Sequence, residues 1–163
     1  MAFFIYDCPF AQGRGRGERI RPLPQLNSLR LWHVLAVPDI RVSTAAIYRA
    51  WDTRSKKRNS PKRVTLTIPR FNDKISALRL KKCSDVSLRG LLHNDLQAVT
   101  SSFYPEVRQI QDTFKQLGLK SVLMSGSGPA VFATVSSGKE AAALCRQLKK
   151  RRHSWLVFRV RTR

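Results

Sequence analysis

The stretch LMSGSGPAVFATV, residues 123–135, contains the residues whose types and spacing most suggest chemistry. It places Gly126, Ser127 and Gly128 between an apolar segment and an alternating apolar run. Small side chains let successive backbone N–H groups face one anion, so the loop could hold phosphate. The stretch matches neither G-x-x-x-x-G-K-[ST] nor G-x-G-x-x-G, and a strand-like run follows it rather than a helix. From spacing alone a glycine hairpin turn is favoured, and phosphate binding stays open as the alternative.

Few other residues are candidates for chemistry. The chain has three histidines, which are His33, His93 and His153. None has a matching carboxylate or cysteine in a recognisable arrangement, so we expect them to be structural or exposed. The three cysteines, which show no CxxC or Cys/His metal spacing, are Cys8, Cys83 and Cys145. We therefore expect reduced thiols in a cytoplasmic protein, with no metal site, and we assign no catalytic residue.

The charge of the chain is strongly positive. Lys and Arg number 31 against 10 Asp and Glu, which gives a formal net charge of +21 over 163 residues. Such an excess attracts polyanions without selecting among them. A basic nucleic-acid-binding module without enzymatic activity is therefore one interpretation, supported by KKRNSPKR at 56–63 and KKRRH at 149–153. No RNP-type run is present, so no specific nucleic-acid site is expected. No apolar run approaches the roughly 20 residues of a membrane span, so no membrane partner is expected.

Strands and helices must position these candidates. Apolar or alternating runs predict strands at residues 3–6, 31–37, 120–124, 129–135 and 155–160. The glycine- and proline-rich loop after the first of these leaves room for a short strand at 18–21. Four helices are predicted: one capped by Ser43 or Thr44 and reaching Ala50, one from residue 88, one from Pro105 to just before Gly118, and one capped by Ser137. The polar, basic residues 53–63 are expected to form a loop.

The order of these elements predicts the fold class. It is strand, helix, helical pair, strand, strand, helix, strand. That order matches an α+β fold, a ferredoxin-like split βαβ sandwich with extra helices.

Several stretches together resemble a known family. LMSGSGPAVFATV is similar to the third conserved motif of the GHMP kinases. Three further stretches resemble, in this order, the 4-diphosphocytidyl-2-C-methyl-D-erythritol kinases of that superfamily: FFIYDCPFAQGRGRGE, VLAVPDIRVSTAAIYRAWD and LLHNDLQAVTSSFYPEV. The resemblance implies a two-lobed enzyme. It assigns residues 1–30 to the end of the N-terminal lobe and residues 31–163 to the GHMP kinase C-terminal lobe, with 53–87 as a basic connecting segment.

The resemblance also implies a reaction and a set of site residues. The family phosphorylates the 2-hydroxyl of 4-diphosphocytidyl-2-C-methyl-D-erythritol with ATP in non-mevalonate isoprenoid biosynthesis, so ATP, Mg²⁺ and a small cytidyl diphosphate substrate are expected. The phosphate loop would comprise Ser125, Gly126, Ser127 and Gly128. Phe4 occupies the position of an aromatic residue that stacks on the cytosine ring, although a place in a buried strand explains it equally well. Asn94 and Asp95 match a family pair at a helix start, where helix capping is the expected role.

Two other motifs of the family find no match in the 163 residues. They carry a lysine near the reacting hydroxyl and a long glycine- and serine-rich loop, which the catalytic aspartate follows. Phosphoryl transfer depends on positioning and charge neutralisation around the γ-phosphate. We therefore interpret the chain as the C-terminal portion of such a kinase and expect this polypeptide alone to have no appreciable kinase activity.

Overall fold

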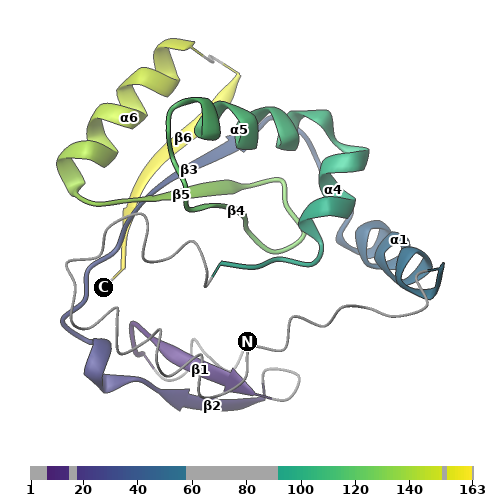
Figure 1. The fold of residues 1–163 in the computed structure, drawn as a ribbon, viewed down its shortest axis with the longest axis horizontal. Coiled ribbons are helices and arrows are strands. Elements are labelled where there is room, and N and C mark those ends of the chain that lie inside the picture. Colours follow the sequence, from purple (N-terminus) through teal and green to yellow (C-terminus); the bar gives the residue numbers. More distant parts are fainter. Residues whose placement is uncertain (1–6, 15–17, 58–91, 152–153, 163) are drawn as a thin grey trace.

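The computed structural model describes residues 7–14, 18–57, 92–151 and 154–162 (Figure 1). A two-stranded antiparallel sheet is formed by β1 (Ala11–Arg14) and β2 (Arg19–Pro22), followed by a 3₁₀ turn, η2 (Pro24–Leu26). A four-stranded sheet contains β3 (Trp32–Pro38), β4 (Val122–Met124), β5 (Val131–Val135) and β6 (Trp155–Arg161). The helices are α1 (Thr44–Lys57), α4 (Gln97–Phe103), α5 (Pro105–Gln116) and α6 (Gly138–Arg151).

The four-stranded sheet confirms the predicted fold class. Its strand order is β4-β5-β3-β6, and each neighbouring pair is antiparallel. One strand of the sheet separates β3 from β4, and another separates β5 from β6, as in a split βαβ sandwich. The predicted α+β class with extra helices is correct. The boundary at residue 30 between two lobes stays a prediction.

The core lies between this sheet and the helices α5 and α6, which cover one of its faces (Figure 1). Alternate residues of β3, Val34 and Ala36, are fully buried on that side. From α5, Ile110 and Phe114 stand one helical turn apart and are also fully buried. The opposite face carries exposed apolar side chains on the edge strand β6, namely Leu156, Phe158 and Val160.

The helix ends confirm the predicted caps. The Ser137 hydroxyl accepts the Glu140 N–H at 3.1 Å at the start of α6. The Ser43 hydroxyl accepts the Ala46 N–H at 3.3 Å at the start of α1. Gly118 has a φ of 81° just beyond α5, the left-handed conformation that closes a helix.

Two predicted boundaries are wrong. Residues 53–57, predicted as loop, continue α1, and Thr53 donates its hydroxyl to the Arg49 carbonyl at 2.9 Å within the helix. Lys and Arg have good helix propensity, and residues 39–60 contain no proline that would interrupt the helix. The helix predicted from residue 88 does not include 92–96, because α4 begins only at Gln97.

Some predictions fall outside the described residues. These are the strand at 3–6, most of the segment 53–87, and residues 88–91. Among the described residues, no helix is long and apolar enough to cross a membrane.

The start of α6 packs tightly on the indole ring of Trp32. A Cβ atom added at Gly138 would lie 2.8 Å from Cζ2 of that ring. The guanidinium groups of Arg159 and Arg161 each lie 5.5 Å from the centre of the ring. The indole therefore joins the first turn of α6 to strands β3 and β6.

We expect Gly138→Ala to destabilise the protein by about 1–3 kcal/mol, because the ring must move to admit the methyl group. In a helix free of contacts the same change stabilises by up to about 1 kcal/mol, so the sign of the effect reports the contact. Urea denaturation followed by circular dichroism measures it. A rise in the midpoint would contradict the tight packing.

Candidate phosphate-binding loop

The glycine-rich loop is a hairpin connection between β4 and β5. Met124 pairs with Val131, and the Ser125 N–H donates to the Ala130 carbonyl at 2.8 Å. A tighter turn lies inside it, where the Gly128 N–H donates to the Ser125 carbonyl at 3.0 Å. The hairpin interpretation of the sequence is therefore confirmed.

Its two glycines are required for different reasons. Gly126 has a φ of 57° and Gly128 a φ of 89°, both in the left-handed region that favours glycine. A Cβ atom on Gly126 would meet nothing within 4 Å. On Gly128 it would lie 3.0 Å from the Met124 sulfur and 3.1 Å from the Thr100 methyl carbon. Glycine is therefore required at position 126 by backbone conformation alone, and at position 128 by both conformation and packing.

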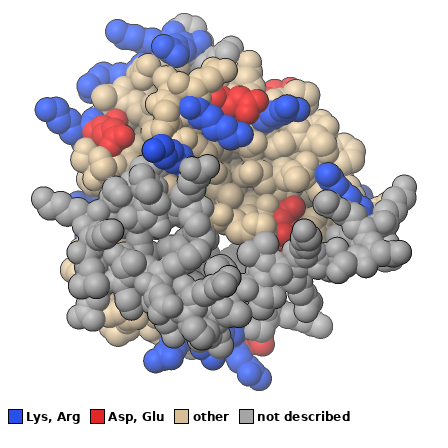
Figure 2. All heavy atoms as spheres, viewed as in Figure 1, with Lys and Arg blue, Asp and Glu red and all other residues tan. Residues whose placement is uncertain are grey.

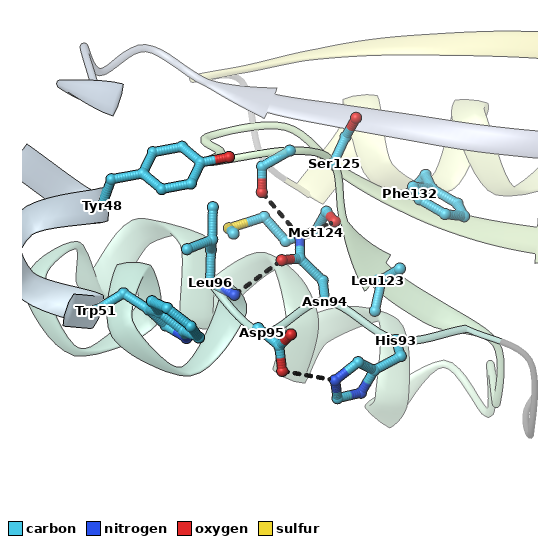
Figure 3. Close-up of a pocket in the computed structure, with 11 residues that line it drawn as sticks. Tyr48, Trp51, His93, Asn94, Asp95, Leu96, Leu123, Met124, Ser125 and Phe132 are labelled. Carbon is cyan, nitrogen blue, oxygen red and sulfur yellow. Dashed lines mark hydrogen bonds and ion pairs between the residues drawn. The ribbon is translucent and has the colours of Figure 1, made fainter. Parts of the chain in front are cut away.

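The side-chain amide of Asn94 holds the loop from below (Figure 3). Its nitrogen donates to the carbonyl oxygens of Met124 and Gly126, each at 2.8 Å. Its oxygen accepts the Leu96 N–H at 2.9 Å. One side chain therefore joins the entry to α4 with the end of β4 and the first turn of the loop.

Residues of α1 and α4 hold the rest of the loop. The Thr100 hydroxyl donates to the Ser127 carbonyl at 3.1 Å. The hydroxyls of Thr44 and Ser127 lie 2.9 Å apart. The Gln97 side-chain oxygen accepts the Met124 N–H at 2.9 Å. The loop is thus fixed by two segments that are distant from it in sequence, the start of α1 and the stretch 94–100.

The pattern leaves two consecutive backbone donors unused. The carbonyls of Ser125, Gly126 and Ser127 all accept hydrogen bonds. Within the part of the chain that the structure describes, the N–H groups of Gly126 and Ser127 donate to no other residue. Adjacent free N–H groups in a fixed turn are the geometry that binds an anion. Ser125, Gly126, Ser127 and Gly128 therefore lie together in a loop suited to phosphate.

A groove of about 570 Å³ lies beside the loop, between α1 and the 93–96 segment (Figure 3). Its apolar walls come from Tyr48 and Trp51 of α1, together with Phe132 of β5. Ser125 and Gly126 contribute the loop side of the groove, and the imidazole of His93 and the carboxylate of Asp95 also line it. Sequence reasoning did not identify Tyr48 or Trp51 as site residues, because aromatic residues in a helix are usually core residues.

Asn94 and Asp95 were predicted to cap a helix, and the structure bears this out only in part. The N-cap position of α4 is Leu96, and the Asn94 side-chain oxygen accepts the Leu96 N–H at 2.9 Å at the entry to this helix. The Asn94 nitrogen also binds the loop carbonyls, a role that the prediction did not include. Asp95 pairs with His93, so the capping prediction is wrong for Asp95.

The expectation that no histidine has a matching carboxylate is wrong for His93. Its Nε2 lies 2.8 Å from the Asp95 carboxylate, and both side chains are largely exposed. In a helix, residues two positions apart do not face each other. The pair forms because this segment is not helical.

His33 has a structural place in β3, as predicted. Its Nδ1 lies 3.0 Å from the Thr134 hydroxyl, and its ring meets Phe132 edge-on at 5.6 Å between centres. Burial lowers the pKa of the His33 imidazole below its usual 6.5. His153, Phe4 and Cys83 lie outside the described residues. The two described cysteines are free, and burial raises the pKa of the Cys145 thiol.

Comparison with known proteins adds a family to this geometry. Residues 75–153 match the family model described as GHMP kinases C terminal. The chain carries a GHMP kinase C-terminal domain. A crystal structure of 4-(cytidine 5'-diphospho)-2C-methyl-D-erythritol kinase matches 98% of this chain and 51% of its own, with a TM-score of 0.68 and 26% identity. Leishmania major mevalonate kinase shares the fold, with a TM-score of 0.62 at 17% identity over 94% of this chain and 48% of its own.

The curated relatives of this GHMP domain are named 4-diphosphocytidyl-2-C-methyl-D-erythritol kinase. The relative from Moorella thermoacetica is 36% identical over 160 residues, which cover 94% of this chain and 53% of the relative. The relative from Syntrophotalea carbinolica is 34% identical over 158 residues, which cover 97% of this chain and 49% of the relative. The chain thus spans about half the length of the curated relatives it matches.

We expect Asn94→Asp to destabilise the GHMP domain by roughly 1–3 kcal/mol. A carboxylate keeps the acceptor for the Leu96 N–H but offers no donor to the Met124 and Gly126 carbonyls. Urea denaturation measures the loss, and amide hydrogen exchange at Ser125 and Gly128, whose N–H groups are bonded within the loop, should become faster. Asp95→Asn, which alters an exposed neighbour, is the control and should change the midpoint little. Equal effects of the two variants would contradict the role of the Asn94 amide.

We expect the stability of the domain to fall as the pH drops below about 6.5. The unfolded chain binds a proton at His33 near that pH, whereas the buried folded-state imidazole does so only at lower pH, so protonation favours unfolding. His33→Gln should reduce this pH dependence between pH 7 and pH 5 by up to about 1.4 kcal/mol per pH unit. Denaturation midpoints at several pH values measure it. An unchanged slope in the variant would contradict the prediction.

Proposed function

We propose that this chain forms part of an ATP-dependent kinase that phosphorylates the 2-hydroxyl of 4-diphosphocytidyl-2-C-methyl-D-erythritol, in the non-mevalonate route to isoprenoids. The observation that carries the proposal is the β4–β5 loop, whose Gly126 and Ser127 N–H groups are free among the described residues. The names of the two curated relatives support the substrate. We expect the enzyme to act in the cytoplasm.

In this proposal the loop binds the phosphoryl group during transfer. Negative charge is spread over the phosphoryl oxygens in the transition state. The N–H groups of Gly126 and Ser127 are fixed before the ligand arrives, because neighbouring side chains already hold the loop carbonyls. Fixed donors stabilise developing charge without a reorganisation cost at the moment of reaction. The hydroxyls of Ser125 and Ser127 supply further donors beside them.

The other end of the proposed site involves Phe4. We assign it to stacking on the cytosine ring, by the resemblance of its surrounding sequence to the family. An aromatic side chain suits a planar base because offset stacking adds to the burial of both rings.

ATP is the proposed phosphoryl donor, and the loop fits a phosphate. The family resemblance also implies Mg²⁺. Among the described residues, no group of three or more His, Cys, Asp or Glu could hold a metal ion. The proposal therefore assigns none of the described residues to Mg²⁺.

The same residues explain why we propose that the 163-residue polypeptide alone does not turn over. The groove is lined by the imidazole of His93 and the carboxylate of Asp95, which are hydrogen-bonded to each other. No described lysine lines the groove to neutralise a transferring phosphoryl group. Two N–H groups without that charge supply only part of the required stabilisation.

A chimera tests the proposed function. It joins the part of the Moorella thermoacetica kinase that precedes the matched region to the start of this chain. We expect the chimera to release ADP only when both ATP and 4-diphosphocytidyl-2-C-methyl-D-erythritol are present, and the 163-residue chain to release none. Turnover by the 163-residue chain alone would refute its proposed inactivity. No turnover by a folded chimera would refute the proposed kinase function.

Gly126→Ala in the chimera tests the loop itself. The alanine disfavours the φ of 57° that aims the two N–H groups, and we expect kcat to fall by roughly 100-fold, as for loss of one oxyanion donor. Gly118→Ala is the matched control, because Gly118 also has a positive φ and open space around it but lies outside the loop. Similar falls in kcat for both variants would show that the loop has no special role.

A further inference from the structure

The outward surface of α6 carries a line of basic residues. Lys139, Arg146 and Lys150 are all exposed. Arg146 and Lys150 lie seven and eleven positions after Lys139. At about 100° per residue, the three side chains therefore fall within a sector of about 40° on one side of the helix. With a rise of about 1.5 Å per residue, the line is about 16 Å long.

Two further cations extend this line toward β6. Lys149 of α6 and Arg159 of β6 both lie close enough to the Cys145 thiol to act on it electrostatically. The Arg159 guanidinium stacks over Trp32 at 5.5 Å, which orients an otherwise exposed side chain. We call the combined surface the α6 basic face. It comprises Lys139, Arg146, Lys149, Lys150 and Arg159.

Nothing described in the protein neutralises the α6 basic face. The basic members of the ion pairs among the described residues are Arg19, His93, Arg108 and Lys115. None of these residues belongs to the α6 basic face. The one acidic residue of α6 is Glu140, whose carboxylate accepts hydrogen bonds from the N–H and hydroxyl of Ser136. Figure 2 shows Lys and Arg side chains gathered where α6 runs in Figure 1. The cations therefore repel one another unless an external polyanion binds.

We propose that the α6 basic face binds the phosphate backbone of nucleic acid without sequence preference. Phosphate contacts from Lys and Arg supply affinity but carry no sequence information. Apart from Trp32, which the arginines cover, no aromatic side chain belongs to this face to stack on bases. The surface thus favours contacts to the backbone over contacts to bases.

A membrane surface fits the same residues less well. A helix that lies on a membrane inserts large apolar side chains beneath its basic residues. The large apolar residues of α6, Leu144 and Leu148, are buried in the protein core. The exposed residue between Lys139 and Arg146 on the outward line is the small Ala143.

This inference does not depend on the proposed kinase function. No residue of α6 lines the groove beside the glycine loop. Binding of nucleic acid and transfer of phosphate can therefore succeed or fail separately.

The test measures binding of the full chain to a labelled 20-nucleotide single-stranded RNA by fluorescence anisotropy between 0.05 and 0.3 M KCl. Five backbone contacts predict a slope of about −3.5 for log Kobs against log salt, at about −0.7 per contact. Arg146→Ala with Lys150→Ala should bring the slope to about −2.1 and weaken binding about 25-fold at 0.1 M salt. Single-stranded DNA of the same length should behave alike.

The matched control is Arg108→Ala with Lys115→Ala. It removes the same charge from α5, where both residues pair with Asp112 at 3.7 Å and 3.4 Å, and should weaken binding less than threefold. Arg146→Lys with Lys150→Arg should retain full affinity. Circular dichroism verifies that each variant is folded.

Several results would overturn the proposal. They are no RNA binding at 0.1 M salt, equal losses for the α5 and α6 pairs, or a tenfold preference among RNA sequences. A fourth result would reassign the face to membranes. The chain would bind vesicles that contain 30% phosphatidylserine but not RNA, and the Arg146→Ala with Lys150→Ala variant would lose the vesicle binding.

Discussion

The site depends on one side chain, the amide of Asn94. Its two N–H bonds satisfy carbonyls at the end of β4 and in the glycine turn, and its oxygen fixes the entry to α4. Three hydrogen bonds from one amide join segments about 30 residues apart in sequence. A buried or half-buried carbonyl without a donor is costly, so the loop has few alternative conformations. The carbonyls are held inward, whereas the N–H groups of Gly126 and Ser127 have no partner among the described residues.

Most of the fold could be predicted because its signals are local. The apolar run of β3, the alternation of β6, the helical period of α5, and the caps at Ser43, Ser137 and Gly118 are each signals within a few residues. The two errors of boundary also have local causes. Leu92 and Leu96 fit a helical period, but the Asn94 side chain competes with the helix by accepting the Leu96 N–H. The basic residues 53–57 looked like a loop by charge, although their helix propensity is good.

The site was less predictable, because its decisive contacts join distant residues. The loop residues Ser125–Gly128 followed from the sequence. The amide of Asn94, the hydroxyl of Thr100 and the ring of Tyr48 reach the loop or its groove only in the folded chain. There α1 contacts α4, and α4 bonds to the end of β4 and to the loop. No spacing rule gives such contacts. The His93–Asp95 pair was missed for a related reason, since it exists only where the predicted helix does not form.

The edge strand β6 has a consequence for how molecules of this protein behave toward one another. Its outer side pairs with no other strand among the described residues, and Leu156, Phe158 and Val160 are exposed on its uncovered face. An edge that is both apolar and unpaired is a template for strands of other molecules. Here Arg159 and Arg161 alternate with those residues and are fixed over Trp32. A second β6 laid alongside in an antiparallel arrangement would bring like charges together, so the arginines oppose aggregation through this edge.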